Sequence, residues 1–453
     1  MHHLKLLSLP CDELLCLKIA YPNVIAPAPP MLKSIPDCPT RRCFLKLTSL
    51  AALALATGQP SVGLASQVYR HTMLSAKTPD ANPPDLITLF LCGDVMTGRG
   101  IDQILPYPNA PRLYEPYVTS AVDYVKLAEA VHGPIPQPVD YPYPWGDALK
   151  ILNQAAPDVR IINLETAVTR SNDPWPGKSI HYRMHPQNVP CLTVAGIDCC
   201  VIANNHVLDW SYAGLAETLT TLHQANLKTT GAGHDRQAAQ APAVLTASGK
   251  GRVLVFAFGH ESSGIPERWA ARPDKPGVNR LEDLPEDTVR HIATQIQAVK
   301  QPRDIIVASL HWGGNWGYAI PDSQHRFARQ LIDQSGVDIV HGHSSHHPKG
   351  IEVYHQRPIL YGCGDLINDY EGIQGYESFR DDLTFLYLLS MAPAKGHLVR
   401  FTMVPMQLYR FRLQRASPAD ARWLAATLDR ECRQLGCQVT QSEDNSFILH
   451  WQA

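Results

Sequence analysis

Five short apolar runs in this chain are each followed by side chains that can bind a metal ion or transfer a proton. The runs comprise residues 86–91, 159–164, 199–203, 305–310 and 337–340. The side chains that follow them are those of Asp94, Glu165, Asn205, His206, His311, His341, His343 and His346. Carboxylate, amide and imidazole ligands without thiolate favour manganese, zinc or iron. The pattern therefore predicts a divalent metal centre built from distant parts of the chain.

The same stretch of sequence offers an acid–base pair. His206 and Asp209 stand in the segment Asn204-Asn205-His206-Val207-Leu208-Asp209. The carbonyl oxygen of Asn205 is an uncharged hard ligand, whereas an imidazole whose other nitrogen is held by a carboxylate can donate a proton to a leaving group. We predict that His206 and Asp209 are catalytic.

The apolar runs themselves are typical of buried strands, because they are rich in β-branched and aliphatic residues. Helical patterns follow them at residues 145–156, 212–225, 284–300 and 323–335. This alternation predicts a mostly parallel, layered α/β fold. Ligands collect at the carboxyl ends of the strands in such folds, so we expect the polar side chains to converge there.

Composition excludes some classes of partner and suggests a cellular location. The 453 residues carry a formal charge of -2 without a basic stripe, which argues against a nucleic-acid partner. The segment Thr40-Arg41-Arg42-Cys43-Phe44-Leu45-Lys46, followed by the apolar run 50–56, resembles a twin-arginine export signal. Residues 1–65 are therefore expected to be a leader, with Met31 as an alternative start. The expected location is periplasmic, or extracytoplasmic and membrane-associated.

The rest of the chain is expected to contain a linker, one main domain and a C-terminal part. Residues 66–84 read as a proline-containing linker, and residues 85–370 as the main domain. Residues 371–453 are expected to complete the fold as a small extension, with strands at 383–390 and 398–408 and a helix from Ser417. Cys432 and Cys437 are expected either to form a disulfide or to remain two free thiols.

Taken together, these motifs resemble the CapA family of capsule-synthesis proteins, within the calcineurin-like metallophosphoesterase superfamily. The resemblance spans residues 87–370. It is carried by Gly93-Asp94-Val95-Met96, Asn163-Leu164-Glu165, Ala203-Asn204-Asn205-His206 with Asp209, His311-Trp312-Gly313, the loop 342–346, and Gly364-Asp365-Leu366-Ile367-Asn368-Asp369. The resemblance implies a layered sheet sandwich flanked by helices, with a metal site at the strand ends.

The resemblance also implies roles for single residues. The expected ligands of one or two divalent ions are Asp94, Glu165, Asn205, His311, His343 and His346, with His341 as an alternate and Glu165 as the bridge if two ions bind. Expected substrate contacts are Arg99, Asn163, Asn204, Trp312, Asp365 and Asn368. For Arg99, a structural role is the alternative to a contact with substrate. The sequence departs from the superfamily pattern in two places. Met96 stands where the usual Asp-x-His has its histidine, and in the late loop, where relatives tend to carry His-x-His, Ser344 stands two residues before His346. The late ligands are then His343 with His346, or His341 with His343.

The function implied is a metal-dependent hydrolase of a phosphoester or γ-glutamyl bond, acting in the metabolism of poly-γ-glutamate or another cell-envelope polymer. Its substrate would be an anionic polymer or a small phosphoester, and capsule-synthesis proteins at the membrane are expected partners. The alternative is a component of capsule synthesis and export that binds the polymer without turning it over.

Overall fold

The computed structural model describes residues 85–452. The predicted export signal, the alternative start at Met31 and the linker at 66–84 lie outside the described residues. Within the described part of the chain, no helix is long and apolar enough to cross a membrane.

The larger sheet has ten strands and holds the first three predicted runs. Across the sheet the order is β20 (Cys437–Gln441), β21 (Phe447–Trp451), β18 (His397–Tyr409), β17 (Leu383–Ala392), β1 (Ile87–Val95), β2 (Val159–Leu164), β5 (Cys199–Val201) and β6 (Lys228–Thr230), with β16 (Asp365–Ile367) beside β1 and β19 (Arg412–Arg415) beside β18. Strands β1, β2, β5 and β6 are parallel to one another, and β17 runs antiparallel to β1.

The smaller sheet has seven strands and holds the last two predicted runs. Its order is β11 (Arg280–Leu281), β9 (Gly251–His260), β12 (Ile305–His311), β13 (Ile339–His343), β15 (Arg357–Leu360) and β14 (Ile351–Tyr354), with β8 (Ala243–Ala247) beside β9. Strands β9, β12, β13 and β15 are parallel. Two pairs of short strands stand apart, β3 (Ala167–Val168) with β4 (Arg183–Met184) and β7 (Ala232–Gly233) with β10 (Gly277–Val278).

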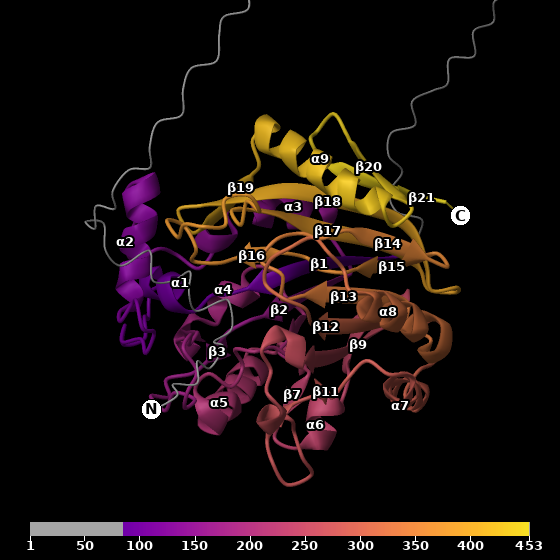
Figure 1. The fold of residues 1–453 in the computed structure, drawn as a ribbon, viewed down its shortest axis with the longest axis horizontal. Helices are drawn as coiled ribbons and strands as arrows, with labels where there is room; N and C mark the ends of the chain where they lie inside the picture. The colour runs from indigo at the N-terminus through magenta and orange to yellow at the C-terminus, as the bar shows by residue number, and fades with distance from the viewer. Residues whose placement is uncertain (1–84, 453) are drawn as a thin grey trace, which may run out of the picture. The chain divides into compact units, whose positions relative to one another are not determined.

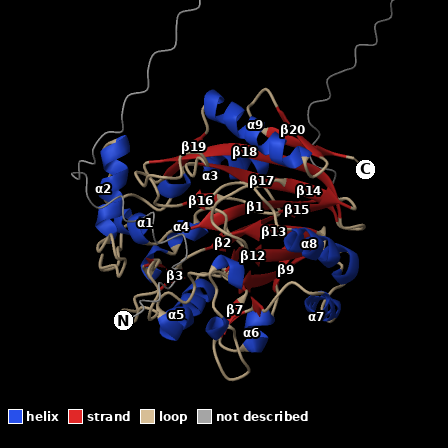
Figure 2. Cartoon of the chain, in the orientation of Figure 1, coloured by secondary structure: helices blue, strands red, loops and turns tan. Residues whose placement is uncertain are grey.

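Figure 2 shows the strands gathered in the middle of the molecule and the helices around them. The helices are α1 (Arg99–Ile104), α2 (Ala121–His132), α3 (Asp147–Ala155), α4 (Pro190–Thr193), α5 (Ser211–Gln224), α6 (Arg236–Gln240), α7 (Glu286–Gln297), α8 (Asp322–Ser335) and α9 (Pro418–Arg433). Helices α3 and α7 lie within their predicted ranges, and α5 and α8 each begin one residue before theirs. Helix α9 begins where expected, because the Ser417 side chain caps it and proline occupies its first position.

The core lies between the two sheets, which makes the fold a sandwich. Leu89 and Ile161 of the larger sheet share one buried cluster with Val255 and Val307 of the smaller sheet. Because successive side chains of a strand point to opposite faces, the neighbours of these residues in the smaller sheet face outward. There Phe256 packs in a second cluster with residues of α7 and α8. The predicted α/β sheet sandwich flanked by helices is confirmed (Figure 1).

The C-terminal part contributes directly to the larger sheet. Strand β17 pairs with β1 over residues Ile87 to Leu91, so the strand that carries Asp94 lies in the interior of the sheet. This integration is greater than the small extension that the sequence suggested. All cysteines of the described residues are free, including Cys432 and Cys437. Of the two alternatives stated for this pair, a disulfide or two free thiols, the structure therefore has the free thiols.

Candidate metal centre

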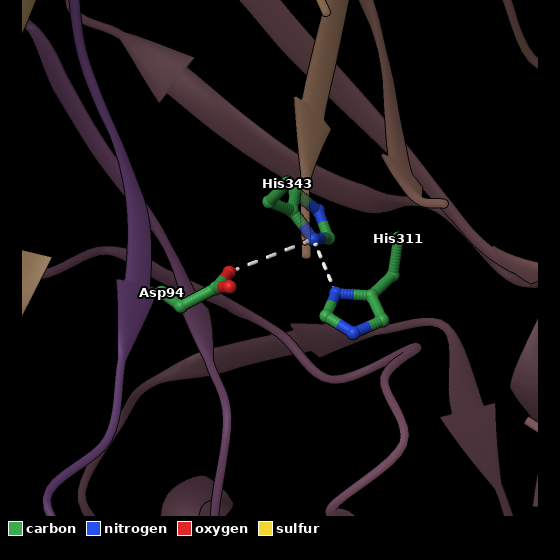
Figure 3. A group of neighbouring side chains, drawn as sticks. All are labelled: Asp94, His311 and His343. Atoms are coloured by element: carbon green, nitrogen blue, oxygen red, sulfur yellow. Dashed lines mark hydrogen bonds and ion pairs between the residues drawn. The ribbon is translucent and has the colours of Figure 1, made fainter. Parts of the chain in front are cut away.

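The polar side chains meet where strand ends of the two sheets face each other. In the larger sheet Asp94 is in register with Asn163 of β2 and with Asp365 of β16. In the smaller sheet His311 is in register with His343. Figure 3 shows Asp94 pointing from its strand toward the two imidazoles. Residues far apart in the sequence are therefore brought together as expected from the strand pattern.

A close approach of two backbones positions Asp94. The Asp94 amide donates a hydrogen bond of 2.9 Å to the carbonyl oxygen of Gly364. A Cβ atom at Gly93 would lie 1.6 Å from the same oxygen, so only glycine fits there. The Gly93-Asp94 motif thus joins β1 to the segment that carries Asp365.

One group of possible metal ligands consists of Asp94, His311 and His343, whose ligand atoms lie within 4.8 Å of one another. The two Nδ1 atoms of His311 and His343 are 2.8 Å apart, and Nδ1 of His343 is 3.9 Å from Oδ1 of Asp94 (Figure 3). Burial lowers the pKa of both imidazoles well below the usual value. Both rings are therefore neutral near pH 7 and have lone pairs available for a cation.

A second group shares Asp94 and adds His346 and Asp365, again with ligand atoms within 4.8 Å. Nδ1 of His346 is 2.9 Å from Oδ1 of Asp365. Burial alone would lower the pKa of His346, but the adjacent Asp365 carboxylate raises it above the usual value. The residue common to the two groups is Asp94, whereas the sequence analysis expected Glu165 to bridge.

Glu165 lies beside the first group and is almost completely buried. Its Oε1 atom is 3.8 Å from Nε2 of His311, and its Oε2 atom has no hydrogen-bond partner among the described residues. Burial, followed by the neighbouring Asp94, raises the pKa of Glu165 well above the usual value. Burial and Asp365 likewise raise the pKa of Asp94.

A cation fits this site by charge and by donor chemistry. The side chains of Asp94, Glu165 and Asp365 are buried near one another, and the raised pKa values of Asp94 and Glu165 show that ionisation of these two is costly without a compensating positive charge. The unpartnered Glu165 oxygen and the neutral imidazoles supply further donors. Asn205 adds an amide oxygen 2.9 Å from Nε2 of His311. This buried Asp/His cluster can hold a divalent ion.

The predicted acid–base pair borders the same cluster. Nδ1 of His206 is 2.6 Å from Oδ2 of Asp209, and Nε2 of His206 is 3.7 Å from Oε1 of Glu165. Burial lowers the pKa of His206 to about 4. Lys178, which the sequence analysis did not single out, places Nζ 2.9 Å from Oδ1 of Asp209 and 3.2 Å from Nδ1 of His206. A lone lysine in a proline-containing loop carries no sequence signal of this role.

Three asparagines expected to contact substrate instead hold other site residues. Asn163 donates from Nδ2 to Oδ1 of Asp94 over 2.7 Å. Asn204 donates to Oδ1 of Asn163 over 3.0 Å, and Asn368 donates to Oδ2 of Asp365 over 3.0 Å. Asp365 itself, also an expected substrate contact, belongs to the second ligand group.

The remaining predicted residues belong to neither ligand group. Trp312 is buried and donates from Nε1 to the carbonyl oxygen of Tyr361, so it is a core residue. His341 has Nε2 2.7 Å from the carbonyl oxygen of Cys92 and belongs to neither ligand group, which leaves His343 with His346 as the late pair. The Arg99 side chain is only 2% exposed and forms ion pairs with Glu115 and Asp369. The structural alternative for Arg99 therefore fits the structure better than substrate contact.

Comparison with known proteins now gives the family. The model of the family described as "Bacterial capsule synthesis protein PGA_cap" matches residues 88–370. The chain belongs to this family. It is 50% identical over 366 residues to a probable polyglutamine synthesis accessory protein of Mycobacterium tuberculosis, covering 81% of this chain and 96% of that protein. The resemblance to capsule-synthesis proteins is thereby confirmed.

Two more distant similarities complete the comparison. A PGA biosynthesis protein CapA of Bacillus subtilis is 26% identical to this PGA_cap protein over 349 residues, covering 77% of each chain. Among solved structures, a phosphatase of Mycoplasma pneumoniae aligns with a TM-score of 0.39 and 10% identity, covering 71% of this chain and 94% of that one.

Proposed function

We propose that this PGA_cap family protein is a divalent-metal-dependent hydrolase of a phosphoester or γ-glutamyl bond in the metabolism of a cell-envelope polymer. The observation that carries the proposal is the juxtaposition of His206, held by Asp209, with two buried ligand groups that share Asp94. The names of the relatives, polyglutamine synthesis accessory protein and PGA biosynthesis protein, support a polymer of glutamate or glutamine units as the substrate.

The residues of the proposed site have two kinds of role: some would hold cations and others would transfer a proton. Asp94, His311 and His343 would hold one ion, and Asp94, His346 and Asp365 a second, with Glu165 and Asn205 beside the first group. When bound, divalent ions supply Lewis acidity and make water a nucleophile at neutral pH. Manganese, zinc or iron suits this mixture of oxygen and imidazole donors.

His206 is the proposed proton donor to the leaving group. In the doubly protonated ring, Nδ1 donates to Asp209, and Nε2, directed toward Glu165 and the ligand groups, carries the proton for the leaving group. Lys178 balances the charge of Asp209 and donates a further hydrogen bond to the carbonyl oxygen of Ile180, so Asp209 stays ionised and keeps the ring oriented. Because burial lowers the pKa of His206 to about 4, the ring must bind a second proton before it acts, and it then gives that proton up readily as a general acid.

We also propose export through the twin-arginine route, supported by the Arg41-Arg42 motif and the apolar run that follows it. The route carries folded proteins, so a protein loaded with metal in the cytoplasm would reach the periplasm or the outer face of the membrane with its ions bound. There it would meet the polymer and other capsule-synthesis proteins. Replacement of both arginines by lysine should retain the protein in the cytoplasm, as judged by cell fractionation.

The test of the hydrolase is metal content of the full chain, purified without chelator, beside an Asp94→Asn variant. We expect one or two equivalents of transition metal in the parent and a loss in the variant, because Asp94 belongs to both ligand groups. Asp123→Asn is the matched control, since Asp123 is an exposed residue of α2 whose partner is Lys126. Metal-loaded parent and His206→Gln are then compared on a phosphodiester and on γ-glutamyl peptides.

Each result has a defined meaning. Hydrolysis of either substrate that falls at least a hundredfold in His206→Gln supports the proposal, because general acid catalysis contributes about that much or more. Absence of metal in the parent after incubation with manganese or zinc refutes it. Metal without turnover, together with polymer binding that survives in His206→Gln, leaves the binding component of capsule synthesis as the function.

A further inference from the structure

A cavity of about 170 Å³ opens beside the second ligand group. His346 forms part of its wall, and the ring of Trp316 lies 5.4 Å from the ring of His346. On another side the cavity is lined by Tyr182, whose ring meets the ring of His206 edge-on at 4.6 Å. A group in this cavity would therefore lie close to both the ligand groups and the proposed proton donor.

The walls of the cavity are mostly aromatic and aliphatic. The uncharged side chains that line it include those of Tyr124, Leu127, Tyr182, Trp316 and Ile373. Asn315 and Gln374 are exposed and place two side-chain amides among them. A volume of this size is below that of a site for a drug-sized ligand, so it suits a single side chain.

The charge balance of the cavity disfavours an anion. Arg99, which lines it, is paired with two carboxylates, those of Glu115 and Asp369, and its guanidinium centre is 3.8 Å from the ring centre of Tyr124. No lysine or further arginine is among the described residues that line the cavity. In metal-free protein, a carboxylate that entered would lose its water without gaining a free cation, whereas a carboxamide could bond to the amides of Asn315 and Gln374 at a smaller cost of desolvation.

We infer that this cavity is a specificity subsite that takes an uncharged, carboxamide-bearing unit of the substrate and discriminates against a unit with a free carboxylate. This inference rests on the proposed function for the choice of a glutamate- or glutamine-type polymer. It goes further by naming the chemical state of the unit that lies next to the bond to be cleaved. The charge-paired Arg99, in this view, shapes the cavity wall and does not recognise an anion.

The test measures binding of two matched probes to the full chain. The probes are γ-linked glutamyl trimers, one with free α-carboxylates and the other with α-carboxamides. Calorimetry, with tryptophan fluorescence as a second readout, gives both affinities in metal-free and metal-loaded protein. We expect the parent to bind the carboxamide trimer at least tenfold more tightly in the metal-free state, and the metal-loaded state shows how far an ion beside His346 changes that preference.

A charge placed in the cavity should remove this preference. Leu127→Lys introduces a cation at a residue that lines the cavity, whereas Val131→Lys introduces it one turn away on α2, at a residue that is 58% exposed and outside the lining. We expect Leu127→Lys to bind the carboxylate trimer at least tenfold better than the parent, and Val131→Lys to behave as the parent. Ile373→Lys replaces Leu127→Lys if circular dichroism shows that the latter is unfolded.

The outcomes separate the subsite from the hydrolase. Equal affinities for the two trimers in the parent, tighter binding of the carboxylate trimer, or an effect of Leu127→Lys no larger than that of Val131→Lys overturns the subsite. A carboxamide preference in a protein that binds no metal would retain the subsite and refute only the hydrolase. Turnover without any carboxamide preference would support the hydrolase and refute only the subsite.

Discussion

Removal of the buried Arg99 charge should destabilise the fold strongly. The guanidinium donates from Nε to Oδ2 of Asp369 over 3.1 Å and from Nη1 to Oε1 of Glu115 over 3.1 Å. The side chains of these two acids are 0% exposed, so Arg99→Met leaves two buried carboxylates without their cation. Breaking a buried ion pair by removing one partner costs about 3–5 kcal/mol. We expect a loss in that range in the free energy of unfolding.

Urea unfolding of the full chain, followed by tryptophan fluorescence, measures this loss. Arg170→Met is the matched control, since the Arg170 side chain is 70% exposed and its ion pair with Glu217 should contribute no more than about 1 kcal/mol. Adding Glu115→Gln to Arg99→Met should recover part of the loss, because it removes one of the two uncompensated charges. Recovery in the double variant would show that charge, and not lost packing, causes the effect.

A small loss of stability in Arg99→Met would refute the structural role of Arg99. A loss below about 1 kcal/mol for Arg99→Met, similar to that of Arg170→Met, is incompatible with a buried cation between two carboxylates. If the same variant also bound the carboxylate trimer at least tenfold more weakly than the parent, Arg99 would recognise an anion. The substrate contact considered from the sequence would then be restored.

Three further predictions concern the site and its surroundings. Gly93→Ala should lower both metal content and melting temperature, because its Cβ would lie 1.6 Å from the Gly364 oxygen, whereas Gly314→Ala, with open space around it, should change neither. Burial holds the pKa of His181 below the usual 6.5, so the unfolded chain binds the proton first as the pH falls. The free energy of unfolding should therefore decrease below about pH 6.5, by at most about 1.4 kcal/mol per pH unit from this residue, and His181→Phe should make urea midpoints less steep in pH. Adding a chelator to metal-loaded protein should lower the free energy of unfolding by about 2.7 kcal/mol if the free ion had been at 100 times its dissociation constant, and a urea midpoint unchanged by the chelator would contradict a bound ion.

The sequence predicts the strands of the site well because they are buried on both faces. Ile305 to Leu310 and Val159 to Leu164 are nearly continuous apolar runs, as expected for strands inside a parallel sheet. The sequence could not show that these runs lie in two different sheets. Periodicity reports the burial of a strand and not its neighbours, so the meeting of Asp94 with His311 and His343 depended on tertiary packing.

It was harder to predict what each residue does in the site than to predict which residues belong to the site. Asp365 and Asn368 share a motif, but only the fold shows that one joins the ligands and the other donates a hydrogen bond to it. Lys178 carries no pattern at all, and its position follows from the path of the loop back to Asp209. The C-terminal strand β17 was expected, yet its pairing with β1 is a long-range contact that local sequence does not encode.

The missing histidine at Met96 bears on how many ions the site can hold. Met96 is buried and its Sδ atom is 3.8 Å from the hydroxyl of Tyr370, which in turn is 3.4 Å from Nε2 of His346. It therefore packs beside the second ligand group without adding a donor of its own to that group's three members. Asp94, His346 and Asp365 still offer three possible ligands, so we expect the second group to bind an ion more weakly than a group with the additional histidine would. Because the first group uses His311 and His343, its ligands are independent of Met96, and occupancy of that group should survive when the second is empty.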